Sequence, residues 1–498
     1  MRPTHLHIRT VRALRVLILL SALVAPAAVL GAPSPQRSRP PVIPRGTLIQ
    51  LPGSSGCLAD RSTHRRDCAL VRALKGPAPF LGSDAIAMSG DGRNVYVASS
   101  RSNAIAVLSR DAGTGKLKQR PGAAGCIAAG GSAGCATAIG LRGPNSVAVS
   151  TDGKNVYATA FGSNAVVVFR RDRSTGALTQ LAPGSGCITN AALTGCTTGR
   201  ALGGPDVVAV SRDGTNVYVG AFTGNAVAVF TRNTSSGALT QSGGTGGCIA
   251  AGSADGCASG RALAAPEGLA VSADGHDVYV AAALSNALDV LARTPSTGAL
   301  SQATGGAGCI VNTPLAGCTT GVQLDGPNAV AVSPGDNNVY VTSAFSNSVT
   351  SFARAASTGQ LTQLSGTSAC VIYVLAVGCS LGRTLSDPEG LAVSPDGAGV
   401  YVAAFVSGAI DVLDRSSGSG ALTQKPRSPG CMVSHATPDC TLARGLLGAS
   451  SIVVSPDGRY LYSAAFASDA VAVFKRLTKP LTPTKPVKHV TNPPPGLG

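Results

Sequence analysis

The sequence contains no tryptophan, and its 498 residues include only six histidines. Charged residues make up 13% of the chain, and neither a glycine-rich phosphate-binding loop nor a nucleophile elbow is present. His64, His276 and His435 are the only histidines outside the two chain ends, so candidates for a general base are few. We therefore infer no catalytic residue from the sequence.

The formal net charge of +16 is concentrated at the two ends of the chain. Seven arginines precede residue 46, five lysines and arginines lie at 475 or beyond, and neither end contains an acid. Residues 46–474 therefore carry 28 basic and 24 acidic side chains, a net charge of +4. This balance argues against a basic domain that binds nucleic acid.

The ends are predicted to lie outside the folded domain. Residues 1–32 resemble an export signal, because four arginines precede an apolar run from Val16 to Leu30 that ends in small residues. An uncleaved anchor is the alternative. Residues 33–45 form a Pro/Arg linker and residues 476–498 a Pro/Lys-rich disordered tail. These basic ends suggest contact with an anionic cell envelope, the alternative being a solvated tether.

A repeat fills the rest of the chain. A tyrosine recurs every 61 residues, at Tyr96, Tyr157, Tyr218, Tyr279, Tyr340, Tyr401 and Tyr462. An Asp-Gly pair precedes this tyrosine in six of the seven copies. In the second full copy we predict strands at Ser146–Ser150, Asn155–Ala160, Ala165–Arg170 and Gly176–Leu181. Removing the loop of about 22 residues leaves a unit the size of a four-stranded propeller blade. We therefore predict an all-β, seven-bladed β-propeller over residues 46–475.

The first and last segments are expected to close this ring. The last copy stops after its third strand, Ala470–Phe474. Residues 46–51 match the fourth strand of other copies and begin before any first strand. We predict that they supply the missing outer strand of the seventh blade.

The fourteen cysteines repeat with the blades. An even count, one pair in each copy and an export signal indicate disulfides formed in an oxidising, extracytoplasmic compartment. The repetition favours local pairing, namely Cys57–Cys68, Cys126–Cys135, Cys187–Cys196, Cys248–Cys257, Cys309–Cys318, Cys370–Cys379 and Cys431–Cys440.

Two polar columns are the candidate binding residues. The first, which we call the acid/amide column, precedes each first strand and should ring the mouth of the central channel: Asp84, Asn145, Asp206, Glu267, Asn328, Glu389 and Ser450. The second, the loop arginines, follows the second cysteine by four residues in five copies: Arg72, Arg200, Arg261, Arg383 and Arg444. Every copy with an acid in the first column has an arginine in the second, which favours Arg–carboxylate pairs that brace each loop. A Ca²⁺ site on the carboxylate and amide oxygens is one alternative and simple turn chemistry the other; no metal is assigned.

Several other residues have a structural and a functional interpretation. Phenylalanines near the ends of the second strands pack under the cysteine loops or form a ligand-facing rim: Phe161, Phe222, Phe345, Phe405 and Phe466. The apolar loop between Cys370 and Cys379 buries against a neighbour or marks a contact patch. Asp289 and Asp411 replace Ala or Val in a third strand and are interpreted as satisfied edge groups.

The pattern Ser-x-Asp-Gly-x-x-Val-Tyr-Val-Ala, as at Ser394–Ala403, resembles the YVTN-type and lactonase-like seven-bladed propeller repeats. The resemblance covers residues 46–475 and implies a fold that serves binding proteins, lactonases and cycloisomerases alike. The resemblance implies that the enzymes of this family use His/Arg/Glu sets or a metal at the channel mouth. In this sequence we can match only the acid/amide column, and not a His/Arg/Glu set. We expect an exported, monomeric binding scaffold for a protein or small-molecule ligand but not nucleic acid. The alternative is a lactonase-like hydrolase, with Ca²⁺ at the channel mouth.

Overall fold

A computed structural model describes residues 42–63, 65–77, 84–252 and 254–481. The predicted export signal, all but the last residues of the predicted linker, most of the predicted tail and His64 lie outside these ranges. Within them, no helix is long and apolar enough to cross a membrane.

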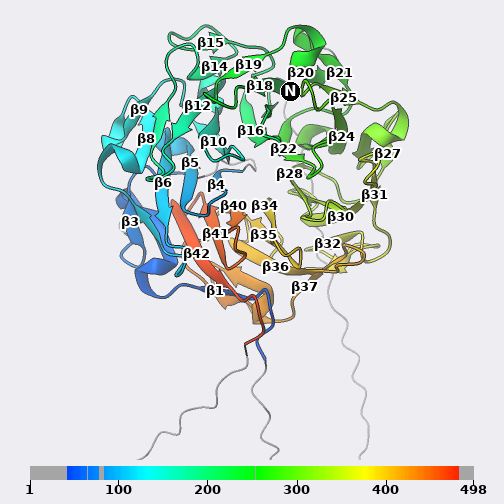
Figure 1. The fold of residues 1–498 in the computed structure, drawn as a ribbon. Coiled ribbons are helices and arrows are strands. Elements are labelled where there is room, and N and C mark those ends of the chain that lie inside the picture. The colour runs from blue at the N-terminus through cyan, green and yellow to red at the C-terminus, as the bar shows by residue number, and fades with distance from the viewer. Residues whose placement is uncertain (1–41, 64, 78–83, 253, 482–498) are drawn as a thin grey trace, which may run out of the picture. The chain divides into compact units, whose positions relative to one another are not determined.

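The described residues form seven sheets of six strands each, which succeed one another around a ring (Figure 1). The predicted seven-bladed propeller is confirmed. One strand of each sheet borders the centre of the ring, and these inner strands are β4 (Ile86–Met88), β10 (Pro144–Val149), β16 (Pro205–Val210), β22 (Pro266–Val271), β28 (Pro327–Val332), β34 (Pro388–Val393) and β40 (Ala449–Val454).

Each inner strand forms a hairpin with a second strand, through an Asp-Gly turn in six blades and through Gly335-Asp336 after β28. In the third blade, Asp213 Oδ1 accepts hydrogen bonds from the Ser211 hydroxyl and the Thr215 N–H, and Gly214 takes a φ of +71° that favours glycine. The second strands are β5 (Asn94–Ser99), β11 (Asn155–Ala160), β17 (Asn216–Ala221), β23 (Asp277–Ala282), β29 (Asn338–Ser343), β35 (Gly399–Ala404) and β41 (Tyr460–Ala465).

A third strand follows in each blade and pairs antiparallel with the second. These strands are β6 (Ala104–Arg110), β12 (Ala165–Arg171), β18 (Ala226–Arg232), β24 (Ala287–Arg293), β30 (Ser348–Arg354), β36 (Ala409–Arg415) and β42 (Ala470–Arg476). The second strands are buried along their whole length, because neighbouring blades cover both of their faces. The repeat tyrosines are among these buried residues, so their spacing of 61 residues corresponds to packing between blades.

The outer part of each blade is more elaborate than the predicted single fourth strand. A short strand pairs with the second half of the third strand: β1 (Leu48–Gln50), β7 (Leu117–Gln119), β13 (Leu178–Gln180), β19 (Leu239–Gln241), β25 (Leu300–Gln302), β31 (Leu361–Gln363) and β37 (Leu422–Gln424). The strand that starts at the first cysteine pairs with its first half: β2 (Cys57–Asp60), β8 (Cys126–Ala129), β14 (Cys187–Thr189), β20 (Cys248–Ala251), β26 (Cys309–Val311), β32 (Cys370–Ile372) and β38 (Cys431–Val433).

A sixth strand runs parallel to the cysteine strand at the rim. These edge strands are β3 (Ala69–Val71), β9 (Ala136–Ala138), β15 (Thr197–Thr198), β21 (Ala258–Gly260), β27 (Thr319–Thr320), β33 (Ser380–Leu381) and β39 (Thr441–Leu442). All seven predicted disulfides are confirmed, with Cα–Cα distances of 4.7–4.9 Å. Each disulfide joins the start of a cysteine strand to the residue just before the edge strand. The prediction of four strands per blade was therefore too low, because the loop it left unassigned adds two strands that the disulfide holds together.

The chain ends meet in the seventh blade, as predicted. Strand β1 pairs with β42, with Leu48 opposite Arg476 and Gln50 opposite Phe474. Strand β2 extends the closure, since Cys57 lies opposite Ala472. The amino-terminal strands in blue therefore lie beside the red strand β42 in Figure 1. The seventh sheet thus combines strands from both ends of the described part of the chain, and no sheet of that part is left open in the ring.

Neighbouring blades are joined by an arginine at the end of each third strand, which is buried in six blades and half-buried at Arg415. Its Nε donates to the hydroxyl of the repeat tyrosine in the preceding blade at 2.6–2.8 Å. In six blades its Nη2 also pairs with the Asp of the preceding Asp-Gly turn, as in Arg232–Asp152 at 2.9 Å. Arg415 has no such aspartate because Gly335 occupies that position. This network fixes each blade against the last.

Candidate functional site

The acid/amide column lies where the inner strands begin. In six blades the column residue is at a β-bulge: in β16, Pro205 pairs with Ala221 and Val207 with Gly220, so Asp206 has no partner across the hairpin. Bulges re-aim side chains and are common beside functional sites. The same irregularity in successive blades brings the polar column to one level of the ring.

Adjacent inner strands approach closely at this level. The Val147 N–H donates to the carbonyl oxygen of Asp84 at 3.0 Å, and Asn145 Nδ2 donates to Asp206 Oδ1 at 2.6 Å. The column residues from Asn145 to Ser450 are at most 5% exposed, whereas Asp84 is exposed. Most of the column is thus a buried polar belt, and its exposed member is Asp84.

Burial dominates the electrostatics of the belt. It raises the pKa of Asp206, Glu267 and Glu389 well above the ordinary carboxyl values, and mutual repulsion raises the pKa of the two glutamates further. The pKa of Asp84 rises to about 6 through the same desolvation. The residue nevertheless keeps solvent-accessible surface.

Two carboxylate oxygens of the belt are buried without a partner. Asp206 Oδ2 and Glu389 Oε2 receive no hydrogen bond from any residue that the structure describes. Buried oxygens of this kind are costly, so such positions warrant a functional explanation.

The loop arginines do not pair with these acids, so the predicted Arg–carboxylate pairs are wrong. Arg200 donates to the carbonyl oxygens of Asp255 and Gly244 in the next cysteine loop, at 2.7 and 3.0 Å. Arg72, Arg261, Arg383 and Arg444 make equivalent bonds to carbonyls. The physical reason is position: Arg200 follows the outermost strand of one blade, whereas Asp206 starts the innermost strand of the next.

The belt does not form a compact set of metal ligands. Among the described residues, the one cluster of three potential ligands within 4.8 Å of one another is Cys57, Asp67 and Cys68, and its two sulfurs form a disulfide. A Ca²⁺ ion would need several oxygens at 2.3–2.6 Å. The belt supplies suitable oxygen donors, but the carboxylates would have to approach one another to hold the ion.

One acid near the belt was missed by the sequence analysis. Asp387 directly precedes β34 and has a φ of +55°, at a position that is Gly143, Gly204 or Gly326 in other blades. Burial raises its pKa, and its charge in turn raises the pKa of Glu267 and Glu389. The sequence could have indicated this residue, because Asp387 is an acid at a position that is glycine in several other repeats.

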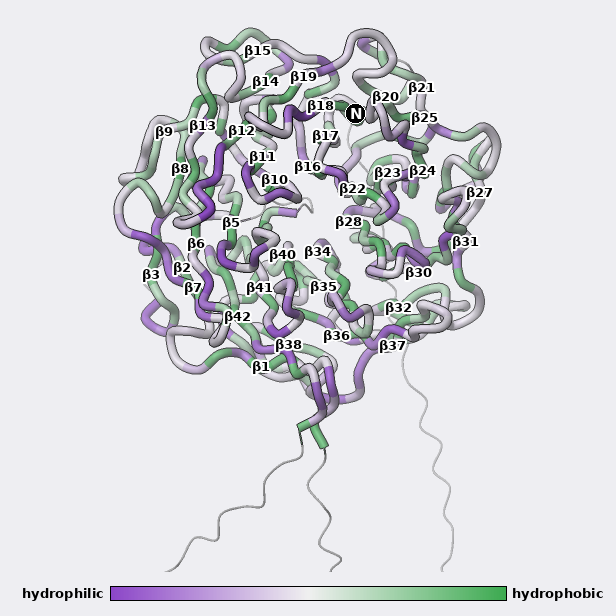
Figure 2. The backbone as a smooth tube through the Cα atoms, in the orientation of Figure 1, coloured by the Kyte–Doolittle hydropathy of each residue, from purple (hydrophilic) through white to green (hydrophobic). Residues whose placement is uncertain are grey.

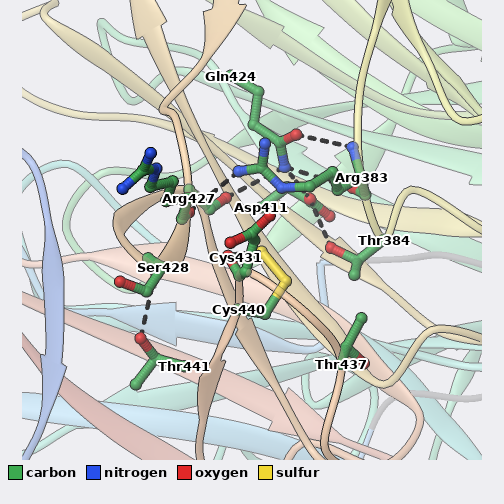
Figure 3. The surroundings of a disulfide bond; sticks show 12 residues. Arg383, Thr384, Asp411, Gln424, Arg427, Ser428, Cys431, Thr437, Cys440 and Thr441 are labelled. Carbon is green, nitrogen blue, oxygen red and sulfur yellow. Dashed lines mark hydrogen bonds between the residues drawn. A yellow bond between two sulfur atoms is a disulfide. The ribbon is translucent and has the colours of Figure 1, made fainter. Parts of the chain in front are cut away.

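Asp289 and Asp411 lie inside their blades next to the disulfides, as Figure 3 shows for Asp411 beside Cys431–Cys440. Each accepts a hydrogen bond from the glutamine of the neighbouring short strand, Gln302 or Gln424. Their second oxygens are buried without a partner among the described residues. The interpretation as satisfied edge groups is therefore wrong, because third strands are interior strands of the blade.

The remaining candidates lie on the surface or pack between connections. The Phe161 ring packs beside Gly204, where an added Cβ would lie 2.9 Å from it, and the Phe405 ring packs beside Gly448 in the same way, at 3.3 Å. Phe345 stands one residue further along its turn than the other four phenylalanines do, and it is 68% exposed. Val377, in the loop between Cys370 and Cys379, is fully exposed, so that loop is not covered. His435 is exposed and its Nδ1 lies 3.0 Å from the Ser434 hydroxyl. None of these residues reaches the belt through a described contact.

Two overlapping stretches, residues 83–189 and 138–251, match the family model described as "Lactonase, 7-bladed beta-propeller". No curated protein matches the sequence. Among solved structures, hydrazine synthase of Kuenenia stuttgartiensis is 18% identical, with 81% of this chain and 97% of that chain covered and a TM-score of 0.50.

Two further structures are similar at lower scores. A putative 6-phosphogluconolactonase of Bacteroides uniformis is 17% identical, with 78% of this chain and 91% of that chain covered and a TM-score of 0.48. The periplasmic gluconolactonase PpgL of Pseudomonas aeruginosa is also 17% identical, with 75% and 88% covered and a TM-score of 0.48. The family-model match confirms the resemblance to lactonase-like seven-bladed propellers.

Proposed function

We propose that this lactonase-like seven-bladed propeller is an extracytoplasmic binding module that takes a positively charged group at the acid/amide column. One observation carries the proposal: the carboxyl groups of Asp206, Glu267 and Glu389 are buried together, and none forms an ion pair with a described residue. Seven disulfides and the predicted export signal support a location outside the reducing cytosol.

A bound cation would remove two energetic costs at once. Each ionised carboxylate loses hydration on burial, and the acids repel one another. A cation placed among them favours their charged forms and gives Asp206 Oδ2 and Glu389 Oε2 the partner they lack. The protein would then be more stable with the ligand than without it.

The cation could be Ca²⁺ or a protonated amine, since both complement carboxylate and amide oxygens. Extracellular calcium modules commonly have dissociation constants of about 10⁻⁴–10⁻³ M. An amine instead requires only hydrogen bonds from oxygens spread around the belt, which fits carboxylates that do not meet as a compact ligand set.

The test is a thermal unfolding and calorimetric titration of the full chain with CaCl₂, MgCl₂ and putrescine, before and after chelator treatment. We expect one cation to raise the unfolding temperature and to bind more weakly as pH falls. Glu389→Gln should abolish the shift, whereas Asp289→Asn, a buried acid of a third strand, should retain it. Absence of a shift with all three cations contradicts the proposal.

Hydrolysis of a lactone is a second candidate, favoured by the family-model match, whose range includes Asp84, Asn145 and Asp206. Asp84, with a pKa of about 6 and an exposed side chain, is suited to take a proton from an attacking water near neutral pH.

This second function is tested by hydrolysis of δ-gluconolactone followed by proton release, corrected for the spontaneous rate. We expect the rate to rise with pH through about 6 and Asp84→Asn to lower it by about 10²-fold or more. A rate equal to that of the uncatalysed reaction would eliminate the enzyme alternative and leave cation binding unaffected.

A further inference from the structure

A basic cleft lies between the seventh and first blades, away from the acid/amide column. Its cavity, of about 650 Å³, has an apolar base that includes Leu58 and Leu117 and cationic walls that include Arg61, Lys118 and Arg120. A second cavity of about 520 Å³ is lined by Lys75 and Arg101 and shares Arg61 and Arg72 with the first. In Figure 2, segments of hydrophilic residues, in purple, lie beside the labels β2 and β7. Together the cavities form one track, which we call the basic cleft.

The repeat provides an internal reference for this cleft. The equivalent junction, between the first and second blades, holds a cavity of about 360 Å³. There, Thr179 stands in place of Lys118 and Leu181 in place of Arg120, both 61 residues later. The same blade geometry therefore needs no cation at either position, and the basic side chains serve something other than the fold.

The cations of the cleft are largely unneutralised. Within the described residues, Arg61, Lys75, Lys118 and Arg120 take part in no ion pair, and Arg120 Nε is buried without an acceptor. Of the described residues that line either cavity, Asp60 is the one acid.

That acid is already used internally. Asp60 Oδ1 accepts hydrogen bonds from the Ser62 N–H and hydroxyl, and Oδ2 accepts one from the Leu74 N–H. It therefore has little capacity left to neutralise the arginines. A row of like charges held along one track costs electrostatic energy that an anionic ligand would relieve.

We infer that the basic cleft binds an acidic polysaccharide. A chain with an anionic group on successive sugars would place charges along the two connected cavities. The apolar faces of its rings suit the side chain of Leu70, which lines the first cavity and is 45% exposed. Among the described residues, neither lining includes an aromatic side chain on which nucleotide bases could stack. The guanidinium of Arg101 also lies 3.9 Å from the Phe466 ring centroid, over its face.

The test measures binding of the full chain to oligogalacturonate, which carries carboxylates, and to dextran sulfate, which carries sulfates. Neutral dextran and oligo(dT) are the comparison ligands, at 50 and 200 mM NaCl. The loss variant is Lys118→Thr with Arg120→Leu, which restores the residues of the neighbouring junction and should fold. The reciprocal variant is Thr179→Lys with Leu181→Arg.

At least one acidic glycan should bind while neutral dextran does not, and affinity should fall at the higher salt concentration. The loss variant should bind about tenfold more weakly, as expected when two charge contacts of ~0.5–1 kcal/mol each are removed. If the loss variant does not fold, a gain of affinity in the reciprocal variant still supports the inference. Unchanged affinity in the folded variants, no glycan binding, or tighter binding of oligo(dT) overturns it.

Discussion

The guanidinium Nε of Arg171 donates a hydrogen bond to the hydroxyl of Tyr96 in the preceding blade at 2.8 Å, and that hydroxyl donates to the carbonyl of Gly176 at 2.9 Å. The same two hydrogen bonds recur at every junction between blades, from the arginine of one blade to the tyrosine of the preceding blade and from that tyrosine to a glycine carbonyl. They link the second strand of one blade to the third and outer strands of the next. The network explains why a tyrosine with a polar tip, and not phenylalanine, recurs inside a buried strand.

Tyr157→Phe should lower the free energy of unfolding by about 1–3 kcal/mol, because Arg232 Nε and the Gly237 carbonyl both lose their buried partner. Chemical denaturation of the two proteins at pH 7 measures the difference. Tyr373→Phe is the matched control, since Tyr373 is 45% exposed, and should change stability by less than about 0.5 kcal/mol. Equal effects of the two substitutions would refute a stabilising role for this hydrogen-bond network.

Leu48→Ala should destabilise the protein by about 2–4 kcal/mol, because Leu48 is 3% exposed in the strand that completes the seventh blade. Ile49 is the control on the same strand, since it is 41% exposed and Ile49→Ala leaves the pairing with β42 intact. Thermal unfolding distinguishes them. An unaltered unfolding temperature for Leu48→Ala would mean that closure by β1 contributes little.

Replacement of Cys187 and Cys196 by alanine should cost about 2–3 kcal/mol, as expected from the entropy of closing a loop of about ten residues. The equivalent change at Cys248 and Cys257 should cost the same, since both pairs have a sequence separation of 9. Denaturation without reductant measures both variants. A large difference between the two blades would show that strain or local packing outweighs loop closure.

Stability should be greatest at mildly acidic pH, because two sets of carboxyls titrate in opposite senses. Burial opposes ionisation of Asp274, but hydrogen bonds from Ser272, His276 and Arg354 lower its pKa to about 2. Burial likewise opposes ionisation of Asp213, Asp396 and Asp457, but hydrogen bonds lower their pKa values. Their contribution is complete above the unfolded pKa, near about 4, and is lost as pH falls toward about 2.

The belt acids act on the other side of the maximum. Desolvation raises the pKa of Asp84 to about 6 and those of Asp206, Glu267 and Glu389 as well, so the folded state binds more protons than the unfolded chain above about pH 4. The free energy of unfolding therefore falls as pH rises from about 4 through 6.

Unfolding temperatures from pH 2.5 to 8 in cation-free buffer measure both limbs of this profile. Glu389→Gln should flatten the upper limb and Asp396→Asn the lower one. A profile that rises steadily to pH 8 would contradict the assignment of buried, unneutralised acids to the belt.

The internal repeat made most of the architecture predictable from the sequence. The repeat tyrosines, spaced 61 residues apart without slippage, define seven equivalent units. Each unit holds one cysteine pair, with a separation of nine residues in six units and eleven in the first. Closure also followed from sequence, since residues 46–51 match a strand that the last copy lacks. These features are local or repeated, so the chain order alone specifies them.

The contacts between blades were decided by tertiary structure. Arg200 and Asp206 are six residues apart, yet they lie at the outer and inner sides of successive sheets, so their co-occurrence predicted a pair that does not form. The arginines that pair with turn aspartates of the preceding blade are far from them in the sequence: Arg232 and Asp152 are 80 residues apart, and Arg110 and Asp457 are 347 apart. Likewise, the unneutralised belt of Asp206, Glu267 and Glu389 and the basic cleft arise because circular closure places distant segments side by side. The sequence pattern shows which side chains recur. The closed ring determines which of them are buried together and which of them bind one another.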